Sequence, residues 1–577
     1  MLKTLAKSVR EYKRDSLLSP LFVILEVILE VFIPLVMAML IDQGIDGGNS
    51  KIIIIYGLAL LGLSLLAMLV GALSGIFSAK ASAGFAKNVR HDMFHNVQNF
   101  AFSNIDKFST ASIVTRLTTD VTNVQNAYMM IIRIAVRSPV MMICALIMAF
   151  SINAKIASIF LVAVPFLGIG LALIMKKSYP LFRKMLDTYD TMNNVVQENL
   201  HGVRVVKSFV REDYENQKFQ SVASAIYNIG SKAQKLLMLN SPLMQFTANA
   251  CMLLLAWFGA RAIVLSGGAE LTTGELTSLF SYVMQILISL MMLSMIFVMI
   301  IMSKASADRI CEIINEKSDL EDSSNPIMNV YDGSIDFENV CFSYHSAADR
   351  NVLDNVNLHI LSGETIGLIG GTGSAKSSLV QLIPRIYDVT AGSVKVGGVN
   401  VKDYDLTTLR DNVAFVLQKN VLFSGTIKEN LRWGNENATD EELIHVCKLA
   451  QAHDFIEEFP DKYDTYIEQG GTNVSGGQKQ RLCIARALLK KPKILILDDS
   501  TSAVDTRTDA LISKAFKNEI PYTTKIIIAQ RISSVQNADR IIVLDNGVVN
   551  AVGTHEELLA SNDIYREVYE SQQKGDE

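Results

Sequence analysis

Charged side chains and paired cysteines are scarce in this chain of 577 residues. Charged residues make up 19% and hydrophobic residues 50% of the sequence, a balance that soluble enzymes of this size rarely have. The six cysteines form no CxxC pair and lie too far apart in sequence for a metal knuckle, so we expect reduced, mostly buried thiols. They are Cys144, Cys251, Cys311, Cys341, Cys447 and Cys483. The net charge of −5 gives no argument for nucleic-acid binding.

Long apolar runs occupy the first half of the chain. They span residues 17–41, 52–77, 129–151, 156–175, 237–265 and 277–302. A helix needs about 20 apolar residues to cross a bilayer, so the runs predict six transmembrane helices in a domain at residues 1–320. A large soluble helical core is the alternative, but soluble helices rarely keep such length six times. The first run is too long for a signal peptide and lacks a small-residue cleavage site, so no cleavable signal is expected.

Lysine and arginine gather in alternate connections between these runs. They are frequent before the first run, between the second and third, and between the fourth and fifth, whereas the other connections carry little beyond Lys51 and Lys155. The positive-inside rule then places both termini in the cytoplasm. Because the two long basic connections keep helical periodicity, we expect the membrane helices to extend into the cytoplasm. The turns of these extensions are predicted near 104–112 and 211–219, although a charged solvated turn is an alternative for the second.

From about residue 326 onward, short β-rich runs alternate with helical patterns, which is typical of a parallel α/β sheet. The run 364–370 leads into a near P-loop, in which backbone N–H groups cradle phosphates, Lys376 reaches the β- and γ-phosphates and Ser377 ligates Mg²⁺. A chance glycine-rich turn is the alternative for this segment alone. The loop consists of Gly370, Gly371, Thr372, Gly373, Ser374, Ala375, Lys376, Ser377 and Ser378.

A second β-rich run, 494–498, ends in Asp498. This is the form of a Walker B strand, whose aspartate holds Mg²⁺. A hydrophobic strand ending in Asp is common by itself. The two motifs in this order, however, predict a nucleotide-binding domain at residues 326–577.

Between the two motifs lie Ser475, Gly476, Gly477 and Gln478, which resemble the signature motif of ABC transporter ATPases. The resemblance covers the whole chain. It implies that Tyr344 stacks on adenine, although a buried strand aromatic is the alternative, and that Gln418 senses Mg²⁺ and the attacking water. The stretch from Ser502 to Asp505 resembles the D-loop. Residues 206–215 and 106–120, with Arg116, resemble the regions of the two coupling helices.

Three positions depart from the family pattern. The family carries Glu after the Walker B aspartate as the catalytic base, and here Asp499 is one methylene shorter. The switch histidine is replaced by Gln530, which donates a hydrogen bond but carries no charge. Ala375 replaces the last P-loop glycine. Together they imply a degenerate site that binds ATP and turns it over slowly, beside an intact signature.

Six membrane segments followed by one ATPase domain resemble exporter-type half-transporters. The resemblance implies ATP-driven export of a small amphipathic molecule across a bacterial plasma membrane. ATP and Mg²⁺ are the implied cofactors. The implied partner is a second half-transporter with an intact catalytic Glu and switch His, so that the pair forms a heterodimer in the lipid bilayer. An ATP-gated or regulatory membrane protein and an importer on the exporter scaffold are the alternatives.

Four charged residues interrupt the apolar runs. Glu26 and Glu30 lie four apart in the first run, and Arg133 and Arg137 lie four apart in the third, so each pair shares one helix face. Counted from the outer helix ends, Glu26 and Arg137 lie at similar depth. Because a charge in a bilayer costs at least about 2.5–3.5 kcal/mol, such residues usually pair or face water. Structural ion pairs or wet helix extensions are one interpretation, and contact with substrate in a central cavity is the other.

Overall fold

The computed structural model describes residues 2–344, 350–500 and 504–575, and the chain divides into two compact units. We call Met1–Asn99 together with Ser109–Glu316 the helical unit. Phe100–Phe108 together with Lys317–Glu577 form the sheet unit. The short segment 100–108 therefore belongs by its contacts to the C-terminal unit, although it lies early in the sequence.

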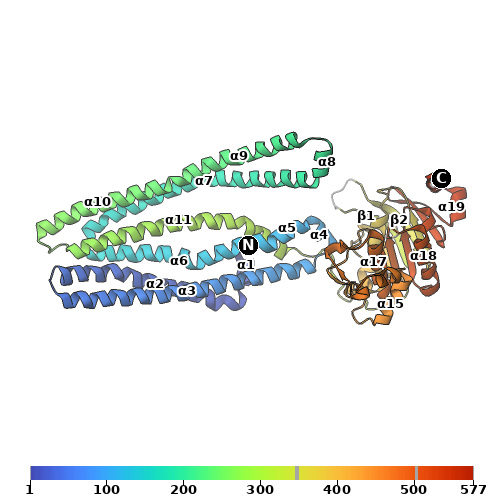
Figure 1. Ribbon diagram of the computed structural model, residues 1–577, viewed down its shortest axis with the longest axis horizontal. Coiled ribbons are helices and arrows are strands. Elements are labelled where there is room, and N and C mark those ends of the chain that lie inside the picture. Colours follow the sequence, from blue (N-terminus) through green and yellow to red (C-terminus); the bar gives the residue numbers. More distant parts are fainter. Residues whose placement is uncertain (1, 345–349, 501–503, 576–577) are drawn as a thin grey trace. The chain divides into compact units, whose positions relative to one another are not determined.

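The helical unit is built of long helices that lie side by side (Figure 1). Its elements are α1 (Leu2–Lys7), η1 (Arg10–Tyr12), α2 (Lys13–Met39), η2 (Leu40–Ile45), α3 (Ser50–Gln98), α5 (Thr110–Thr115), η3 (Arg116–Asp120), α6 (Val121–Ile152), α7 (Ala154–His201), α8 (Val203–Ser208), α9 (Glu212–Met238), α10 (Asn240–Ser266) and α11 (Thr273–Asn315).

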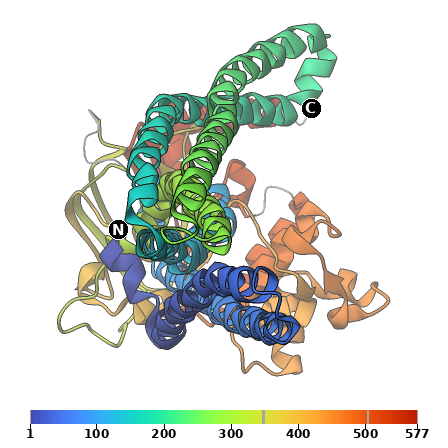
Figure 2. The same ribbon diagram turned by 90° about the vertical axis from the view of Figure 1, so that its left-hand side faces the viewer.

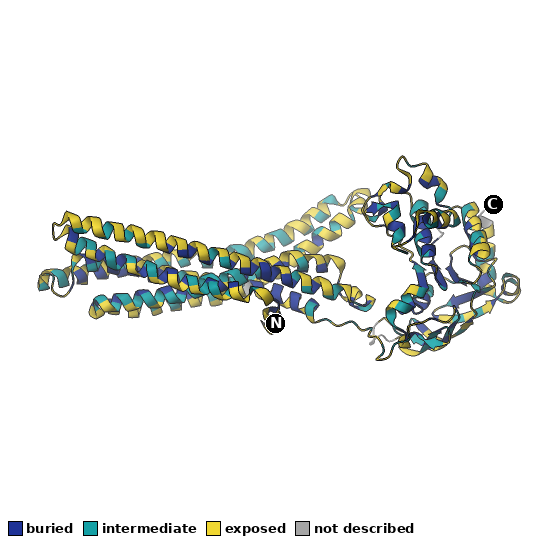
Figure 3. Ribbon diagram, turned by 90° about the horizontal axis from the view of Figure 1, so that it is seen from below, coloured by how far each residue is buried: buried dark blue, intermediate teal, exposed yellow. Residues whose placement is uncertain are grey.

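Six of the described helical stretches are long and apolar enough to cross a membrane, which confirms the predicted number. They are Arg10–Ile45, Ser50–Gln98, Thr110–Ile152, Ala154–His201, Glu212–Ser266 and Thr273–Asn315. Large apolar residues such as Leu58, Val162 and Leu253 are exposed. Figure 3 shows exposed positions along much of the long helices, in yellow. An exposed apolar surface of this extent needs a lipid or protein neighbour, since water would not solvate it favourably.

Small polar residues let α2 and α3 approach closely, and the two helices run together in both views (Figures 1 and 2). Ser19 and Ser74 are fully buried, and each hydroxyl donates to the other's backbone carbonyl, at 3.3 and 3.4 Å. Such pairs satisfy polar groups at a helix interface where lipid offers no hydrogen-bond partner. Charged pairs hold η3 to α11: Asp120 accepts from Arg309, and Arg116 Nη1 donates to Glu312 at 2.7 Å.

The second cytoplasmic turn lies earlier than predicted. Helix α7 ends at His201, α8 fills the connection, and α9 already begins at Glu212, whereas the turn was expected near 211–219. Glu212, Asp213 and Glu215 occupy the first turn of α9, where carboxylates stabilise the positive helix N-terminus. The charged run therefore marks a helix start, and its interpretation as the turn was wrong. The first turn lies between Gln98 and Thr110, close to its predicted position.

The sheet unit contains strands and short helices. They are α4 (Phe102–Lys107), β1 (Ile335–Phe342), β2 (Leu353–Ile360), β3 (Thr365–Ile369), α12 (Lys376–Gln381), β4 (Ala391–Val396), β5 (Val399–Asn400), η4 (Val401–Asp403), α13 (Leu406–Asn412), β6 (Val413–Val416), β7 (Gly425–Thr426), α14 (Ile427–Arg432), α15 (Asp440–Leu449), α16 (His453–Glu457), η5 (Lys462–Asp464), β8 (Tyr466–Ile467), η6 (Gln469–Gly471), α17 (Gly476–Leu489), β9 (Ile494–Asp498), α18 (Thr506–Glu519), β10 (Thr524–Ile528), η7 (Ile532–Ser534), β11 (Arg540–Asp545), β12 (Val548–Gly553), α19 (His555–Ser561) and α20 (Asp563–Gly575).

A six-stranded sheet forms the centre of this unit, in the order β12-β11-β3-β10-β9-β6. All its pairings are parallel except β11 with β12. Strands β9 and β10 are buried throughout and rich in Ile and Leu, as expected where helices or a second sheet cover both faces. One apolar core lies toward α15 and α17, and the other lies toward the antiparallel sheet β2-β1-β4-β5. The carboxyl ends of β3, β10, β9 and β6 therefore meet at one edge, where ligands bind in open α/β sheets.

Candidate nucleotide-binding site

The P-loop follows β3 at this edge and is already closed around its own lysine. Lys376 Nζ donates to the carbonyl oxygens of Gly370 and Gly371, both at 2.8 Å, and to Ser374 Oγ at 3.2 Å. A Cβ at Gly370 would collide with the carbonyl of Leu544, so only glycine fits there. Burial lowers the pKa of Lys376 from its ordinary value, and the carboxylates of Asp498 and Asp499 oppose that shift.

Ala375 adopts the left-handed backbone conformation, with φ +70° and ψ +23°, directly before α12. This conformation costs an L-residue with a Cβ about 1–2 kcal/mol, whereas glycine adopts it freely. The loop still closes around Lys376, so the alanine strains the backbone of the P-loop but does not prevent the loop from forming. The cost of replacing this glycine therefore lies in the backbone conformation of Ala375.

Asp498 ends β9 and lies beside the P-loop. Its carboxylate is buried and accepts a hydrogen bond from Ser377. Burial raises the pKa of the Asp498 carboxyl, the Ser377 bond lowers it, and the neighbouring Asp499 raises it. A divalent cation there would favour the ionised carboxylate.

This pair of side chains fits Mg²⁺, which binds through one or two carboxylates, waters and substrate phosphates. Within the described ranges, no group of three or more His, Cys, Asp and Glu side chains is placed to hold a metal without such phosphates. Gln418 follows β6, whose last residue Val416 pairs with Leu497, so Gln418 lies exposed near the end of β9. Ser500 fixes this junction by donating to the carbonyl of Val416 at 3.2 Å.

Asp499 and Gln530, the two residues predicted at catalytic positions, contact each other. Gln530 Nε2 donates to Asp499 Oδ2 at 2.7 Å. Asp499 follows β9 and Gln530 follows β10, and these strands are parallel neighbours. One oxygen of the Asp499 carboxylate is thus engaged by the Gln530 side chain.

A residue that the sequence motifs did not reveal holds the backbone around Gln530. The amide of Gln572, on α20, donates through Nε2 to the carbonyl of Gln530 at 2.7 Å and accepts from the N–H of Ile532 at 2.9 Å. Gln572 belongs to no motif, and the only signal for it is the amphipathic pattern of the terminal helix. The C-terminal helix therefore fixes the loop that carries Gln530.

Tyr344 lies beside the P-loop helix. Its hydroxyl lies 2.9 Å from Ser378 Oγ and donates to Gln381 Oε1 at 3.3 Å, while its ring packs edge-on against Phe342 and Tyr387. Because the side chain is exposed, it remains accessible for stacking on a base.

The signature residues begin α17. Ser475 Oγ accepts from the N–H of Gln478 at 3.3 Å, and Gln478 Oε1 accepts from the N–H of Ser475 at 2.9 Å, which is a capping box. Ser475 and Gly476 are exposed, so the positive N-terminus of this 14-residue helix is open to an anion brought by another molecule.

The D-loop lies partly outside the described residues, since Ser502 and Ala503 are not among them. Asp505 caps α18: its carboxylate accepts from the N–H and hydroxyl of Thr508 at 2.9 and 2.7 Å. These bonds lower the pKa of the Asp505 carboxyl. The structure thus gives Asp505 a local capping role, and its contact with nucleotide stays a prediction.

Helix α4, in the region that resembles the first coupling helix, packs within the sheet unit. Tyr387 OH donates to Asp106 Oδ2 at 2.7 Å, and Asn104 Nδ2 donates to the carbonyl of Lys317 at 3.0 Å. Tyr387 also contacts the ring of Tyr344. A short chain of side chains therefore links α4 to the aromatic residue beside the P-loop.

The charged residues of the apolar runs form a cluster between α2, α3 and α6. Arg137 donates to Glu26 Oε1 at 2.6 Å and to both carboxylate oxygens of Glu30. Gly71 makes room for Glu26, since a Cβ there would lie 2.8 Å from Oε1. Glu26 Oε2 is buried without a hydrogen-bond partner in the part of the chain that is described. Arg133 lies near Gly75 and outside the triad. Ion pairing thus accounts for three of the four charges, and their role in a substrate cavity stays a prediction.

Comparison with known proteins bears on both units. The profile of the ABC transporter transmembrane region matches residues 16–291, and the ABC transporter profile matches residues 353–502. The uncharacterized ABC transporter ATP-binding protein YfiB of Bacillus subtilis is 36% identical over 569 residues, 98% of each chain. This chain belongs to the ABC transporter family. The ATPase unit of the transporter is thus the sheet unit, and its membrane-spanning helices form the helical unit.

The layout of this ABC transporter is that of an exporter. A solved structure of a bacterial Atm1-family ABC exporter with ATP bound superimposes with a TM-score of 0.83 at 26% identity, over 97% of this chain and 99% of that one. The ATP-dependent lipid A-core flippase of Desulfotalea psychrophila is 31% identical over 86% of each chain. The transporter is therefore a multi-pass protein of a bacterial plasma membrane, with a membrane region and an ATPase domain in one chain.

Proposed function

We propose that this transporter is one half of a heterodimeric exporter, whose own P-loop site binds ATP and Mg²⁺ but hydrolyses ATP slowly. The observation that carries the proposal is the 2.7 Å hydrogen bond between Gln530 Nε2 and Asp499 Oδ2. A general base must lie within about 2.6–3.2 Å of the water it activates. The Asp499 carboxylate is one methylene short for this task and has one oxygen engaged by Gln530. Gln530, being neutral, adds no positive charge to stabilise the transition state.

Nucleotide binding does not depend on these two residues. Lys376 supplies the charge for the phosphates, Ser377 and Asp498 supply the Mg²⁺ ligands, and Tyr344 offers a ring for the adenine. Gln418 follows β6 at the same edge, where it would contact the metal and the water. A site with these groups retains ATP, so its occupancy serves to hold the two ATPase domains together.

The intact signature is the second support. Its capping box leaves the N-terminus of α17 exposed, ready to face phosphates bound on another chain. In a head-to-tail pair, residues 475–478 would complete the partner's site, and that partner would bring the catalytic Glu and switch His. In this proposal, the transported molecule is a small amphipathic compound that moves outward. Both termini of this chain lie in the cytoplasm.

Two substitutions test the asymmetry in the complex of this chain with the half-transporter that copurifies with it. Ser475→Arg should lower ATP turnover about a hundredfold, the cost typical of losing donors at a developing charge. Asp499→Asn should change it less than about twofold, because that site already contributes little.

Thr439→Arg is the matched control for Ser475→Arg. Thr439 is also exposed and caps α15 through a capping box, so the variant would lose about the same 1 kcal/mol of capping energy without affecting the signature. Equal losses from Ser475→Arg and Asp499→Asn would refute the proposal. So would ATP turnover of about 1 s⁻¹ or more by the purified wild-type chain alone.

A further inference from the structure

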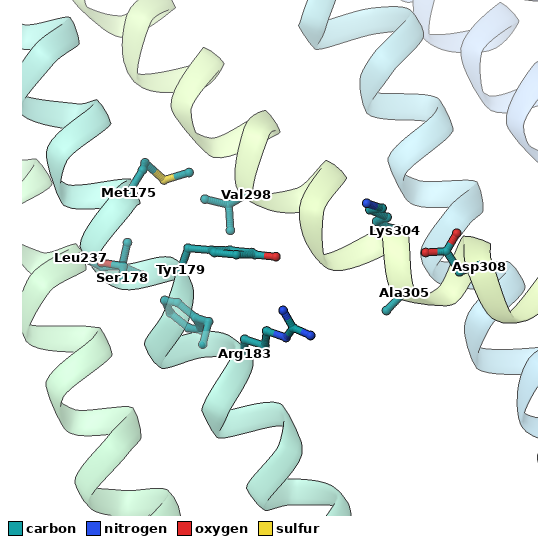
Figure 4. Close-up of a pocket in the computed structure, with 10 residues that line it drawn as sticks. Met175, Ser178, Tyr179, Arg183, Leu237, Val298, Lys304, Ala305 and Asp308 are labelled. Carbon is teal, nitrogen blue, oxygen red and sulfur yellow. The ribbon is translucent and has the colours of Figure 1, made fainter. Parts of the chain in front are cut away.

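Two cavities lie end to end between α7 and α11 in the helical unit. The first is lined by residues that include Met175, Tyr179, Arg183 and Lys304 (Figure 4). The second is lined by Met175 and Tyr179 as well, together with apolar residues of both helices. The two cavities adjoin each other, since they share two lining residues, and we call them together the α7–α11 cleft.

The lining of the cleft changes from apolar to cationic along both helices. The apolar part includes Gly168, Leu171, Ala172, Leu290, Leu293 and Phe297. The cationic part follows on α7 with Lys176 and Arg183, and on α11 with Lys304. At 1.5 Å per residue, the distance from Gly168 to Arg183 along α7 is about 22 Å. The predicted topology places the cationic end toward the cytoplasm.

The cations at this end are not neutralised by the protein. Within residues 2–344, 350–500 and 504–575, none of Lys176, Arg183 and Lys304 forms an ion pair, whereas Arg309, one turn beyond Lys304, is paired with Asp120. Asp308 is the one carboxylate among the described lining residues of the cleft. Figure 4 shows Tyr179 and Arg183 reaching from α7 toward α11, the helix that carries Lys304 and Asp308. The formal charges leave this end of the cleft positive.

A buried hydroxyl at the same end lacks a partner. Ser178 lines the cleft and is only 2% exposed, and its Oγ makes no hydrogen bond within the described part of the chain. Leaving a buried hydroxyl unsatisfied costs about 1–3 kcal/mol, so the site gains when a polar group enters and bonds it. This hydroxyl is independent of the cations and favours a polar ligand group at the same place.

We propose that the α7–α11 cleft binds a single-chain amphipath with an anionic head group, such as a carboxylate, sulfate or phosphate. The apolar chain lies along Leu171 and Phe297, and the head group bonds Arg183 and Lys304. This inference rests on the proposed export function and names its substrate class. The competing explanation is that these cations only anchor the helices at the inner membrane surface, as the positive-inside rule describes.

The test measures binding to the full chain in phosphatidylcholine nanodiscs without nucleotide. The probe is a fatty acid with an environment-sensitive fluorophore, and empty nanodiscs give the lipid background. An alkyl trimethylammonium and an alkyl maltoside of equal chain length serve as competitors. We expect saturable binding that the two competitors displace at least about tenfold less well than an unlabelled fatty acid does, a difference of about 1.4 kcal/mol.

The variants Arg183→Gln and Lys304→Gln, combined in one chain, should weaken fatty-acid binding about tenfold and leave maltoside binding unchanged. Lys184→Gln is the matched control, because Lys184 neighbours Arg183 on α7 and is exposed but lies outside the cleft lining. Ala172→Trp, which fills the apolar part, should weaken all three ligands.

Absence of saturable binding would overturn the proposal. Equal effects of Lys184→Gln and the double variant would do so too, in favour of interfacial anchoring. The experiment contains neither ATP nor a partner, so its failure leaves the asymmetric ATPase untouched. Conversely, if both ATP sites of the transporter hydrolysed ATP equally fast, the fatty-acid binding result would still hold.

Discussion

Replacing Asp499 by Glu and Gln530 by His in one chain should raise the ATP turnover of that chain alone by about a hundredfold or more. The added methylene moves the carboxylate by about one C–C bond, near 1.5 Å. A base that falls short by this length lies about 4 Å from its water, beyond the 2.6–3.2 Å needed for proton transfer. The carboxylate of the longer side chain would also move away from the position where Asp499 Oδ2 now accepts a hydrogen bond from Gln530.

The magnitude follows from the two groups involved. A positioned general base contributes about 10²–10⁴ in rate, and one donor at a developing charge contributes about 10²–10³. Since the two side chains are in contact, their effects should not be additive. Asp499→Glu alone leaves a neutral Gln530, and Gln530→His alone leaves a short carboxylate. Each single variant should therefore gain less than about tenfold.

The assay is phosphate release by the full chain in lipid vesicles, with nucleotide binding measured separately so that turnover and affinity are distinguished. In a pair of two copies of this chain, the signature of each copy would complete the site of the other. Asp461→Glu makes the same chemical change on an exposed loop and should alter nothing. If the double variant binds ATP and yet turns over no faster than wild type, slow hydrolysis does not originate at residues 499 and 530.

Three further outcomes follow from the contacts described. Lys376→Ala should lower the nucleotide retained by the heterodimer at least about tenfold while reducing its turnover less, as measured by trapping labelled nucleotide; equal losses would contradict the binding-only role. Ala375→Gly should relieve about 1–2 kcal/mol of backbone strain against about 0.4–1 kcal/mol of added unfolded-state entropy, so the melting temperature should hold or rise, whereas Ala375→Val should lower it. Arg137→Gln should destabilise the detergent-solubilised protein by about 3 kcal/mol, because Glu26 keeps a buried charge; a change in substrate preference without loss of stability would instead indicate a role in transport.

Apolar length and motif spacing were enough to predict the architecture. The six runs coincide with α2, α3, α6, α7, α10 and α11 because a bilayer-spanning helix must be long and apolar. The cytoplasmic extensions were less predictable, since no bilayer thickness fixes their length. There the residues 212–215 indicated a turn, whereas their carboxylates stabilise the start of α9.

Contacts at the site depend on neighbours that the sequence does not specify. Asp499 and Gln530 were each predicted as catalytic positions, but their hydrogen bond requires β9 and β10 to be adjacent in the sheet. The sequence did not single out Lys304 and Arg183 as binding residues, because the cleft exists only once α7 packs beside α11. The strain at Ala375 likewise became visible only in its φ angle.

Gln572 connects helix α20 to the loop after β10, the loop that carries Gln530. The helix that carries it is described from Asp563 to Gly575. A chain trimmed by proteolysis after Tyr569 would keep every strand of the central sheet and lose both amide bonds to Gln530 and Ile532. The ATP turnover of such a fragment would therefore not represent that of the full chain. A purification tag therefore belongs at the N-terminus, where it leaves these two hydrogen bonds untouched.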